Sequence, residues 1–239
     1  MPGKKKKYGD KHGDNMIKLI KPADVITLLC ALLGFGSIIL TGNGQHDAAL
    51  VLILAAVIAD AADGAVARYS GCGVLGANLD SLADAISFGV APAVAAFIFL
   101  NDLGALAWAS AGFFLVCGIL RLARFNVAGK KDGFEGIPIT SAGFIVALFL
   151  LVRDIVPYAG YVFILLLVVV SFLMVSSVSY PKLKKTVILA PMGVLLVLDI
   201  VVFYLGYPGM VKIASLILLV FVFAYFLSPL GRRFYDRYQ

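Results

Sequence analysis

Four aspartates and an arginine lie close together between two hydrophobic stretches of this 239-residue chain. The segment reads DAADGAVARYSGCGVLGANLDSLAD and runs from Asp60 to Asp84. An ionisable side chain at membrane depth costs about 2.5–3.5 kcal/mol on insertion scales, and neighbouring carboxylates also repel one another. One arginine cannot balance four carboxylates. We therefore infer that a divalent cation binds this segment.

Helical spacing predicts that the four carboxylates point at one place. Asp60 and Asp63 are three residues apart on the second predicted helix, and therefore share a face. Asp80 and Asp84 are four residues apart at the start of the third helix, after a glycine-containing loop. Oxygen ligands without histidine or cysteine favour Mg²⁺ or Mn²⁺, with Ca²⁺ as a further option, over zinc. A cation flanked by Arg68 and small residues suits a pyrophosphate.

Composition identifies the elements that must position these residues. Hydrophobic residues make up 62% of the chain and charged residues only 14%, too few for the surface of a soluble domain or a nucleic-acid groove. About 20 apolar residues span a bilayer. Such runs occupy 24–42, 47–69, 78–100, 103–127, 138–153, 157–178, 186–205 and 209–228. The predicted fold class is an all-α integral membrane protein, a bundle of about eight transmembrane helices.

The distribution of lysine and arginine predicts the topology. With the N-terminus inside, every basic residue except Arg153 and Lys212 is cytoplasmic. Both termini and the aspartate segment then face the cytoplasm from the cell membrane. We divide the chain into a basic, partly disordered segment (1–21), a transmembrane domain (22–230) and a basic cytoplasmic tail (231–239). For the first segment, an interfacial helix and a solvated lead-in are both open.

The aspartate segment resembles the signature of the CDP-alcohol phosphotransferase family, D-x₂-D-G-x₂-A-R followed by G-x₃-D-x₃-D. The fixed positions are all present, as Asp60, Asp63, Gly64, Ala67, Arg68, Gly76, Asp80 and Asp84. The resemblance implies metal-dependent transfer of a phosphatidyl-type group from a CDP-linked lipid to an alcohol, with release of CMP, by a homodimer. It implies that the first three aspartates are metal ligands and that Asp84 is the general base and also touches the metal. The CDP-lipid site would comprise Asp60, Gly64, Ala67, Arg68 and Gly76.

The first helix carries a second, weaker match to the family. Members often have Asn-x₂-Thr near the nucleotide, and here Asp24 to Thr27 occupies that place. Thr27 is therefore predicted to join the CDP-lipid site. Asp24 stands where the family has asparagine, and a role as the N-cap residue of the first helix explains an aspartate at this position equally well.

Residues outside the signature bear on the acceptor alcohol. The stretches DSLADAISFGVAPA, RLARFNV and GIP resemble the phosphatidylserine synthase branch of the family. Arg121 and Arg124 lie three residues apart at the cytoplasmic end of the fourth helix, where an arginine fork suits the serine carboxylate or a lipid phosphate. Asn126 is a weaker candidate. The alternative is that both arginines set topology by snorkelling to the interface.

We therefore predict an enzyme that makes a phosphatidylserine-type lipid from L-serine and a CDP-diacylglycerol or CDP-diether lipid, in contact with membrane lipids and without nucleic acid. Glycerol 3-phosphate or an inositol phosphate is the alternative acceptor, because Arg121, Arg124, Lys130 and Lys131 can hold an extra phosphate. A cation-coupled transporter is the alternative of another class. It explains buried carboxylates but leaves the glycine and arginine positions unexplained.

Overall fold

Helices make up nearly all of the computed structural model, which describes residues 19–70, 73, 75–128, 134–180 and 186–235. They are α2 (Pro22–Gly42), α3 (His46–Ser70), α4 (Gly76–Asp84), α5 (Ala91–Phe99), α6 (Ala105–Ala128), α7 (Ile139–Leu151), α8 (Ala159–Val175), α9 (Thr186–Tyr204) and α10 (Pro208–Tyr235). A π-helix, η1 (Ala85–Val90), joins α4 to α5 into one continuous rod. Each predicted hydrophobic run corresponds to one helix or rod. The helical prediction is thus confirmed.

Short elements complete the connections. The 3₁₀ turns η2 (Asn101–Leu103) and η3 (Arg153–Ile155) follow α5 and α7. The strands β1 (Phe134–Glu135) and β2 (Ser179–Tyr180) form a two-residue antiparallel pair after α6 and α8. Helix α10 continues to Tyr235, into the predicted tail. Residues 1–18 of the predicted N-terminal segment lie outside the described residues.

Four helical stretches among the described residues are long and apolar enough to cross a membrane. They are Pro22–Gly42, His46–Tyr69, Gly76–Phe99 and Ala105–Val127. The apolar parts of the later helices are shorter, and α7 has only 13 residues, or about 20 Å of helix against a hydrocarbon core of about 30 Å.

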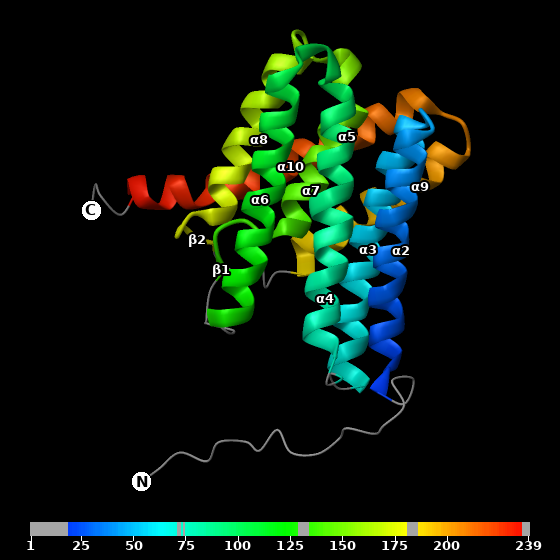
Figure 1. Ribbon diagram of the computed structural model, residues 1–239, viewed down its shortest axis with the longest axis vertical. Helices are drawn as coiled ribbons and strands as arrows, with labels where there is room; N and C mark the ends of the chain where they lie inside the picture. Colours follow the sequence, from blue (N-terminus) through cyan, green and yellow to red (C-terminus); the bar gives the residue numbers. More distant parts are fainter. Residues whose placement is uncertain (1–18, 71–72, 74, 129–133, 181–185, 236–239) are drawn as a thin grey trace.

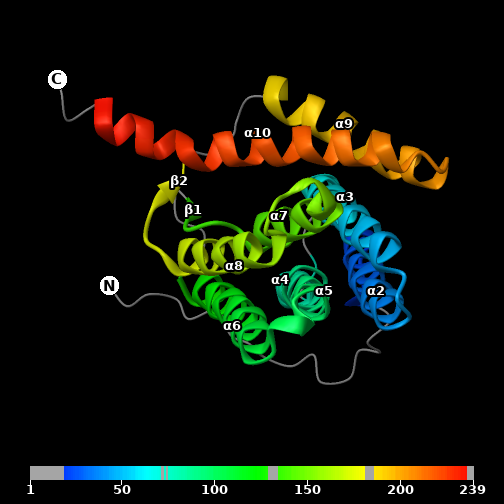
Figure 2. The same ribbon diagram turned by 90° about the horizontal axis from the view of Figure 1, so that it is seen from above.

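The rods from α2 to α8 run alongside one another, whereas α9 and α10 lie across them (Figures 1 and 2). The prediction of one bundle therefore describes the first six rods but not the last two helices. Helices α9 and α10 contact each other, and the buried Ser215 hydroxyl donates to Asp199 Oδ2 at 2.7 Å. They reach the bundle on one side only, through α3 and α7, and leave apolar residues such as Val220 exposed.

Helix α7 lies in the middle of the fold, with α3, α8 and α10 around it (Figure 2). Every residue from Ala142 to Leu151 is buried, as expected for a helix that is hydrophobic on all sides. Gly143 permits close contact with η1, because a Cβ there would lie 2.9 Å from the Phe88 Cα. The rod that carries two of the aspartates thus rests directly on the core helix.

Helix α2 contacts the same rod from the other side. Gly34 has no side chain to hold Ser87 away, since a Cβ there would lie 2.6 Å from the Ser87 Cα. The buried Ser87 hydroxyl donates to the Cys30 carbonyl at 2.8 Å. These contacts hold η1, the π-helix that follows Asp84 directly. Single π-helical turns are frequent at functional sites.

Candidate active site

Three of the four signature aspartates meet where the C-terminal part of α3 faces α4, at the lower end of the bundle in Figure 1. Asp60 comes from α3, and Asp80 and Asp84 come from α4. One carboxylate oxygen from each lies within 4.8 Å of those from the other two. Asp60 and Asp80 are half-buried and Asp84 is buried. Two antiparallel helices therefore bring together carboxylates that are 20 or more residues apart in sequence.

This donor set fits a hard divalent cation. Carboxylate oxygens are the ligands that Mg²⁺, Mn²⁺ and Ca²⁺ prefer. The partial burial of Asp60 and Asp80 limits solvation of their charges, which a cation would replace. Asp60, Asp80 and Asp84 are thus the residues that could hold the metal.

Asp63, the fourth aspartate, has a different partner. Its Oδ2 accepts a hydrogen bond of 2.6 Å from the Thr27 hydroxyl on α2, and both side chains are buried. Asp63 is therefore not part of the three-carboxylate cluster in this structure. Its role as a metal ligand stays a prediction, and Thr27 is the residue that orients it.

Sequence reasoning missed Thr140, whose side chain on α7 interacts with Asp60. Thr140 comes two residues after the GIP stretch, which was noted only as a mark of the family branch. A hydroxyl on a separate helix has no recognisable spacing relative to the aspartates. Only the packing of α7 against α3 brings it to the site.

Asp24 of α2 lies close to Gly73 and to Gly76, the first residue of α4. It accepts a hydrogen bond from the Lys21 backbone N–H at 2.8 Å, and Lys21 rather than Asp24 is the N-cap residue of α2. Its carboxylate also fills the space beside two glycines, because a Cβ would lie 2.8 Å from it at Gly73 and 3.2 Å from it at Gly76. A side chain at the signature glycine Gly76 would therefore press against the Asp24 carboxylate.

Gly64 and its neighbours border open space on α3. Among the described residues, and apart from the backbone of α3 itself, a Cβ at Gly64 would come within 4 Å only of Arg68, whose Nη1 would lie 3.9 Å away. Ala67 is half-buried and Arg68 is exposed. A large anionic ligand can therefore approach the α3 backbone here and meet a guanidinium.

Arg121 of α6 interacts electrostatically with one member of the cluster. The side chain is buried, and its charge interacts with that of Asp84. The Arg121 Cζ lies 5.9 Å from the centre of the Phe125 ring, within cation–π range. A cation is thus held beside the predicted base.

Arg124, one turn further along α6, contacts a different element. Its two terminal nitrogens donate to the Val175 and Ser176 carbonyls at 3.2 Å and to the Met174 carbonyl at 3.5 Å. These carbonyls lie at the C-terminus of α8, where backbone acceptors lack partners within the helix. Arg124 therefore has a structural role as a helix cap. Its predicted contact with the acceptor remains untested.

Asn126 lies beside the signature, through a contact that spacing could not reveal. Ser81, between the two aspartates of α4, donates from its hydroxyl to Asn126 Oδ1 at 3.0 Å. Asn126 is exposed, so its amide is accessible beside α4. Lys130 and Lys131, considered for an acceptor phosphate, lie outside the described residues.

Comparison with known proteins finds a matching family model and similar enzymes. The family model described as CDP-alcohol phosphatidyltransferase matches residues 21–234. Archaetidylserine synthase of Methanothermobacter thermautotrophicus is 39% identical over 163 residues, which cover 66% of this chain and 69% of that protein. CDP-diacylglycerol–serine O-phosphatidyltransferase of Methanocaldococcus jannaschii is 35% identical over 185 residues, covering 77% and 85%. The enzyme of that name from Helicobacter pylori (strain 26695) is 34% identical over 171 residues, covering 68% and 72%.

Proposed function

Because the chain belongs to the CDP-alcohol phosphatidyltransferase family, we propose that it transfers a phosphatidyl-type group from a CDP-linked lipid to L-serine and releases CMP. The observation that carries this proposal is the convergence of three carboxylates from α3 and α4, in a chain whose relatives are named as serine transferases. The names include both diacylglycerol and archaetidyl lipids. We therefore extend the proposal to CDP-diacylglycerol and to its diether counterpart.

Asp60, Asp80 and Asp84 would hold Mg²⁺ or Mn²⁺, with Ca²⁺ as an option. When bound, the cation would offset the negative charge of the pyrophosphate and of the departing CMP. Asp63 stays a candidate ligand through Oδ1, since Thr27 contacts Oδ2.

Asp84 is proposed as the general base. The serine hydroxyl oxygen forms a bond to the lipid-bearing phosphorus, and the bond between that phosphorus and the CMP oxygen breaks. The hydroxyl proton moves to the Asp84 carboxylate, and CMP leaves with the bonding electrons. The buried Arg121 guanidinium interacts electrostatically with the Asp84 carboxylate.

The CDP-lipid is proposed to lie along the open side of α3. Gly64 and Ala67 leave room for it, and Arg68 offers a fork of donors to its phosphates. Gly76 and Thr27 support this site indirectly, through the positions of Asp24 and Asp63.

Arg121 is our candidate for the serine carboxylate. It is buried, adjacent to Asp84 and held near Phe125, so a carboxylate bound there places the serine hydroxyl close to the base. Asn126, oriented by Ser81, is a second contact. Arg124 is the weaker candidate because α8 carbonyls bind its guanidinium.

We further propose a multi-pass protein of the cytoplasmic membrane, acting as a homodimer with the aspartates facing the cytoplasm. Apolar helices and the family support a membrane location. The orientation follows from the basic residues, which the positive-inside rule assigns to the cytoplasmic side.

The test is acceptor specificity in purified protein with CDP-diacylglycerol or its diether counterpart. Radiolabelled serine should enter the lipid fraction with equimolar CMP release when Mg²⁺ or Mn²⁺ is present. Lipid formation from glycerol 3-phosphate or an inositol phosphate, with none from serine, would overturn the assignment of the acceptor. Absence of CMP release with all acceptors, together with ion flux in vesicles, would instead support a transporter.

A further inference from the structure

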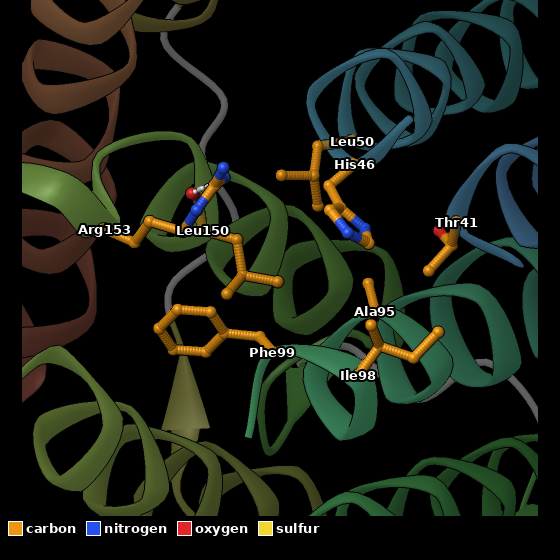
Figure 3. A pocket seen from close by; sticks show the side chains of 8 residues that line it. All are labelled: Thr41, His46, Leu50, Ala95, Ile98, Phe99, Leu150 and Arg153. Carbon is orange, nitrogen blue, oxygen red and sulfur yellow. Dashed lines mark hydrogen bonds between the residues drawn. The ribbon is translucent and has the colours of Figure 1, made fainter. Parts of the chain in front are cut away.

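A cavity of about 140 Å³ lies at the end of the bundle opposite the aspartates (Figure 3). Its walls are Thr41 of α2, His46 and Leu50 of α3, Ala95, Ile98 and Phe99 of α5, Leu150 of α7 and Arg153 of η3. His46 precedes Asp60 by 14 residues of α3, or about 21 Å of helix. The cavity is therefore separate from the candidate active site.

Polar and apolar groups divide the lining of this cavity. Leu50 and Ala95 are buried and Ile98 is half-buried, so part of the wall is apolar. The side chains of His46 and Arg153 lie apart from each other in the lining, with that of Leu50 between them in the view of Figure 3. Among the described residues, the His46 imidazole has no hydrogen-bond partner. Such a lining suits a ligand with a polar or anionic head beside a hydrocarbon part.

Arg153 is held in place before any ligand binds. Its Nη1 donates to Asp47 Oδ1 at 2.8 Å and to the Leu150 carbonyl at 2.7 Å, and its Nε lies 3.7 Å from Asp154. Lys212 of α10 donates to Asp154 at 2.7 Å, and this hydrogen bond lowers the pKa of the Asp154 carboxyl. Within the described part of the chain, Arg153 Nη2 has no hydrogen bond. The guanidinium is thus oriented while one donor group stays available.

The level of the cavity along the membrane-spanning helices indicates which ligand it binds. Helices α2, α3 and the rod from α4 to α5 are long enough to span a bilayer, and the cavity lies where they end. Phospholipid headgroups and the first methylenes of their chains occupy this level. An apolar cavity of about 150 Å³ holds a benzene-sized molecule, so this one admits a phosphate with a few further atoms.

We propose that this cavity binds the headgroup phosphate of a phospholipid from the leaflet opposite the aspartates. Arg153 Nη2 and His46 donate to the phosphate oxygens, and the start of a hydrocarbon chain lies on Ile98 and Phe99. Asp47 and Asp154 offset the charge of Arg153, so direct hydrogen bonds to the phosphate rather than a broad positive field hold the lipid. The proposal is independent of the transferase assignment.

Native mass spectrometry tests the proposed lipid site. The delipidated protein is titrated with phosphatidylglycerol, phosphatidylcholine or inorganic phosphate. We expect one phosphatidylglycerol site that Arg153→Gln weakens about tenfold or more, the effect of losing a charge-assisted hydrogen bond. Lys212→Gln is the matched control, because it removes a nearby charge that does not line the cavity. Arg68→Ala should weaken CDP-lipid binding and leave this site unchanged.

A second variant keeps the proposal testable if loss of Arg153 prevents folding. Ala95→Leu fills the cavity without touching the ion pairs, and we expect it to reduce phosphatidylglycerol binding as strongly, with an unchanged thermal transition. Equal weakening by Lys212→Gln would overturn the proposal, because surface charge would then explain binding. Failure of phosphatidylcholine, which carries the same phosphate, to bind would also overturn it, as would displacement of the lipid by millimolar inorganic phosphate. Unchanged binding in Ala95→Leu would place the lipid elsewhere.

Discussion

Replacing Thr27 by valine removes the hydroxyl that donates to Asp63 but keeps the shape of the side chain. The hydrogen bond is 2.6 Å long and buried, and it joins α2 to α3 one turn after Asp60. A hydrogen bond to a charged group contributes about 1.5–3 kcal/mol, or about ten- to hundredfold in an equilibrium or rate ratio. We therefore expect kcat/KM for the CDP-lipid to fall by that factor in Thr27→Val.

A double-mutant cycle assigns this loss to the hydrogen bond. The variants are Thr27→Val, Asp63→Asn and the two combined, with Thr27→Ser as the control that keeps the hydroxyl. Because Asp63→Asn already weakens the bond, the combined variant should be about ten- to hundredfold more active than the product of the single effects. Where turnover is too low, thermal unfolding in detergent supplies the same comparison.

Additive effects would refute this reasoning. If the combined variant matches the product of the single effects within about twofold, the two side chains do not interact in the working enzyme. Asp63 would then have left Thr27, as full ligation to a metal through both oxygens would require. Low activity in Thr27→Ser would likewise show that the methyl contacts of Thr27 matter more than its hydroxyl.

Three further predictions follow from the site and its supports. Asp84→Asn should lower kcat about 10²–10⁴-fold and leave CDP-lipid binding by equilibrium dialysis nearly intact; full turnover would exclude Asp84 as the base. Arg121→Ala should raise KM for serine, whereas Arg124→Ala should chiefly lower the thermal transition by uncapping α8; the reverse pattern would exchange their roles. Gly143→Ala should destabilise the fold by about 1–3 kcal/mol, because the new Cβ would collide with the η1 backbone. Gly112→Ala is the control, since no described atom lies within 4 Å of a Cβ there. Equal thermal unfolding temperatures for the two variants would contradict the contact between Gly143 and η1.

Local patterns were enough for the helices and for the pairing of aspartates on common helix faces, but not for which of the four aspartates meet. An apolar run long enough to span a bilayer has few alternatives to a helix, since backbone groups in lipid must be satisfied internally. Spacings of three and four residues place Asp60 with Asp63, and Asp80 with Asp84, on common faces. What such spacing cannot specify is the rotation of one helix against another. That rotation leaves Asp63 facing Thr27 while Asp60 joins the α4 pair.

The cross-helix partners required the tertiary structure. The Thr140 side chain on the core helix α7 interacts with Asp60, and the Ser81 hydroxyl donates a hydrogen bond to Asn126 on α6. Arg121 and Arg124 look equivalent in the sequence, one turn apart on one helix. In the packed structure the charge of Arg121 interacts with that of Asp84, whereas Arg124 donates hydrogen bonds to the carbonyls at the end of α8.

The amino-acid sequence by itself determined which residue types carry the chemistry of this protein: carboxylates that could hold a cation, apolar runs long enough to form helices, and the family signature. These features depend on residue types and on spacings within single helices, which follow from helical periodicity. The tertiary structure alone decided which partner each polar group has, the crosswise placement of α9 and α10, and the cavity near Arg153. These depend on contacts between distant segments, which side-chain packing determines and local periodicity does not record.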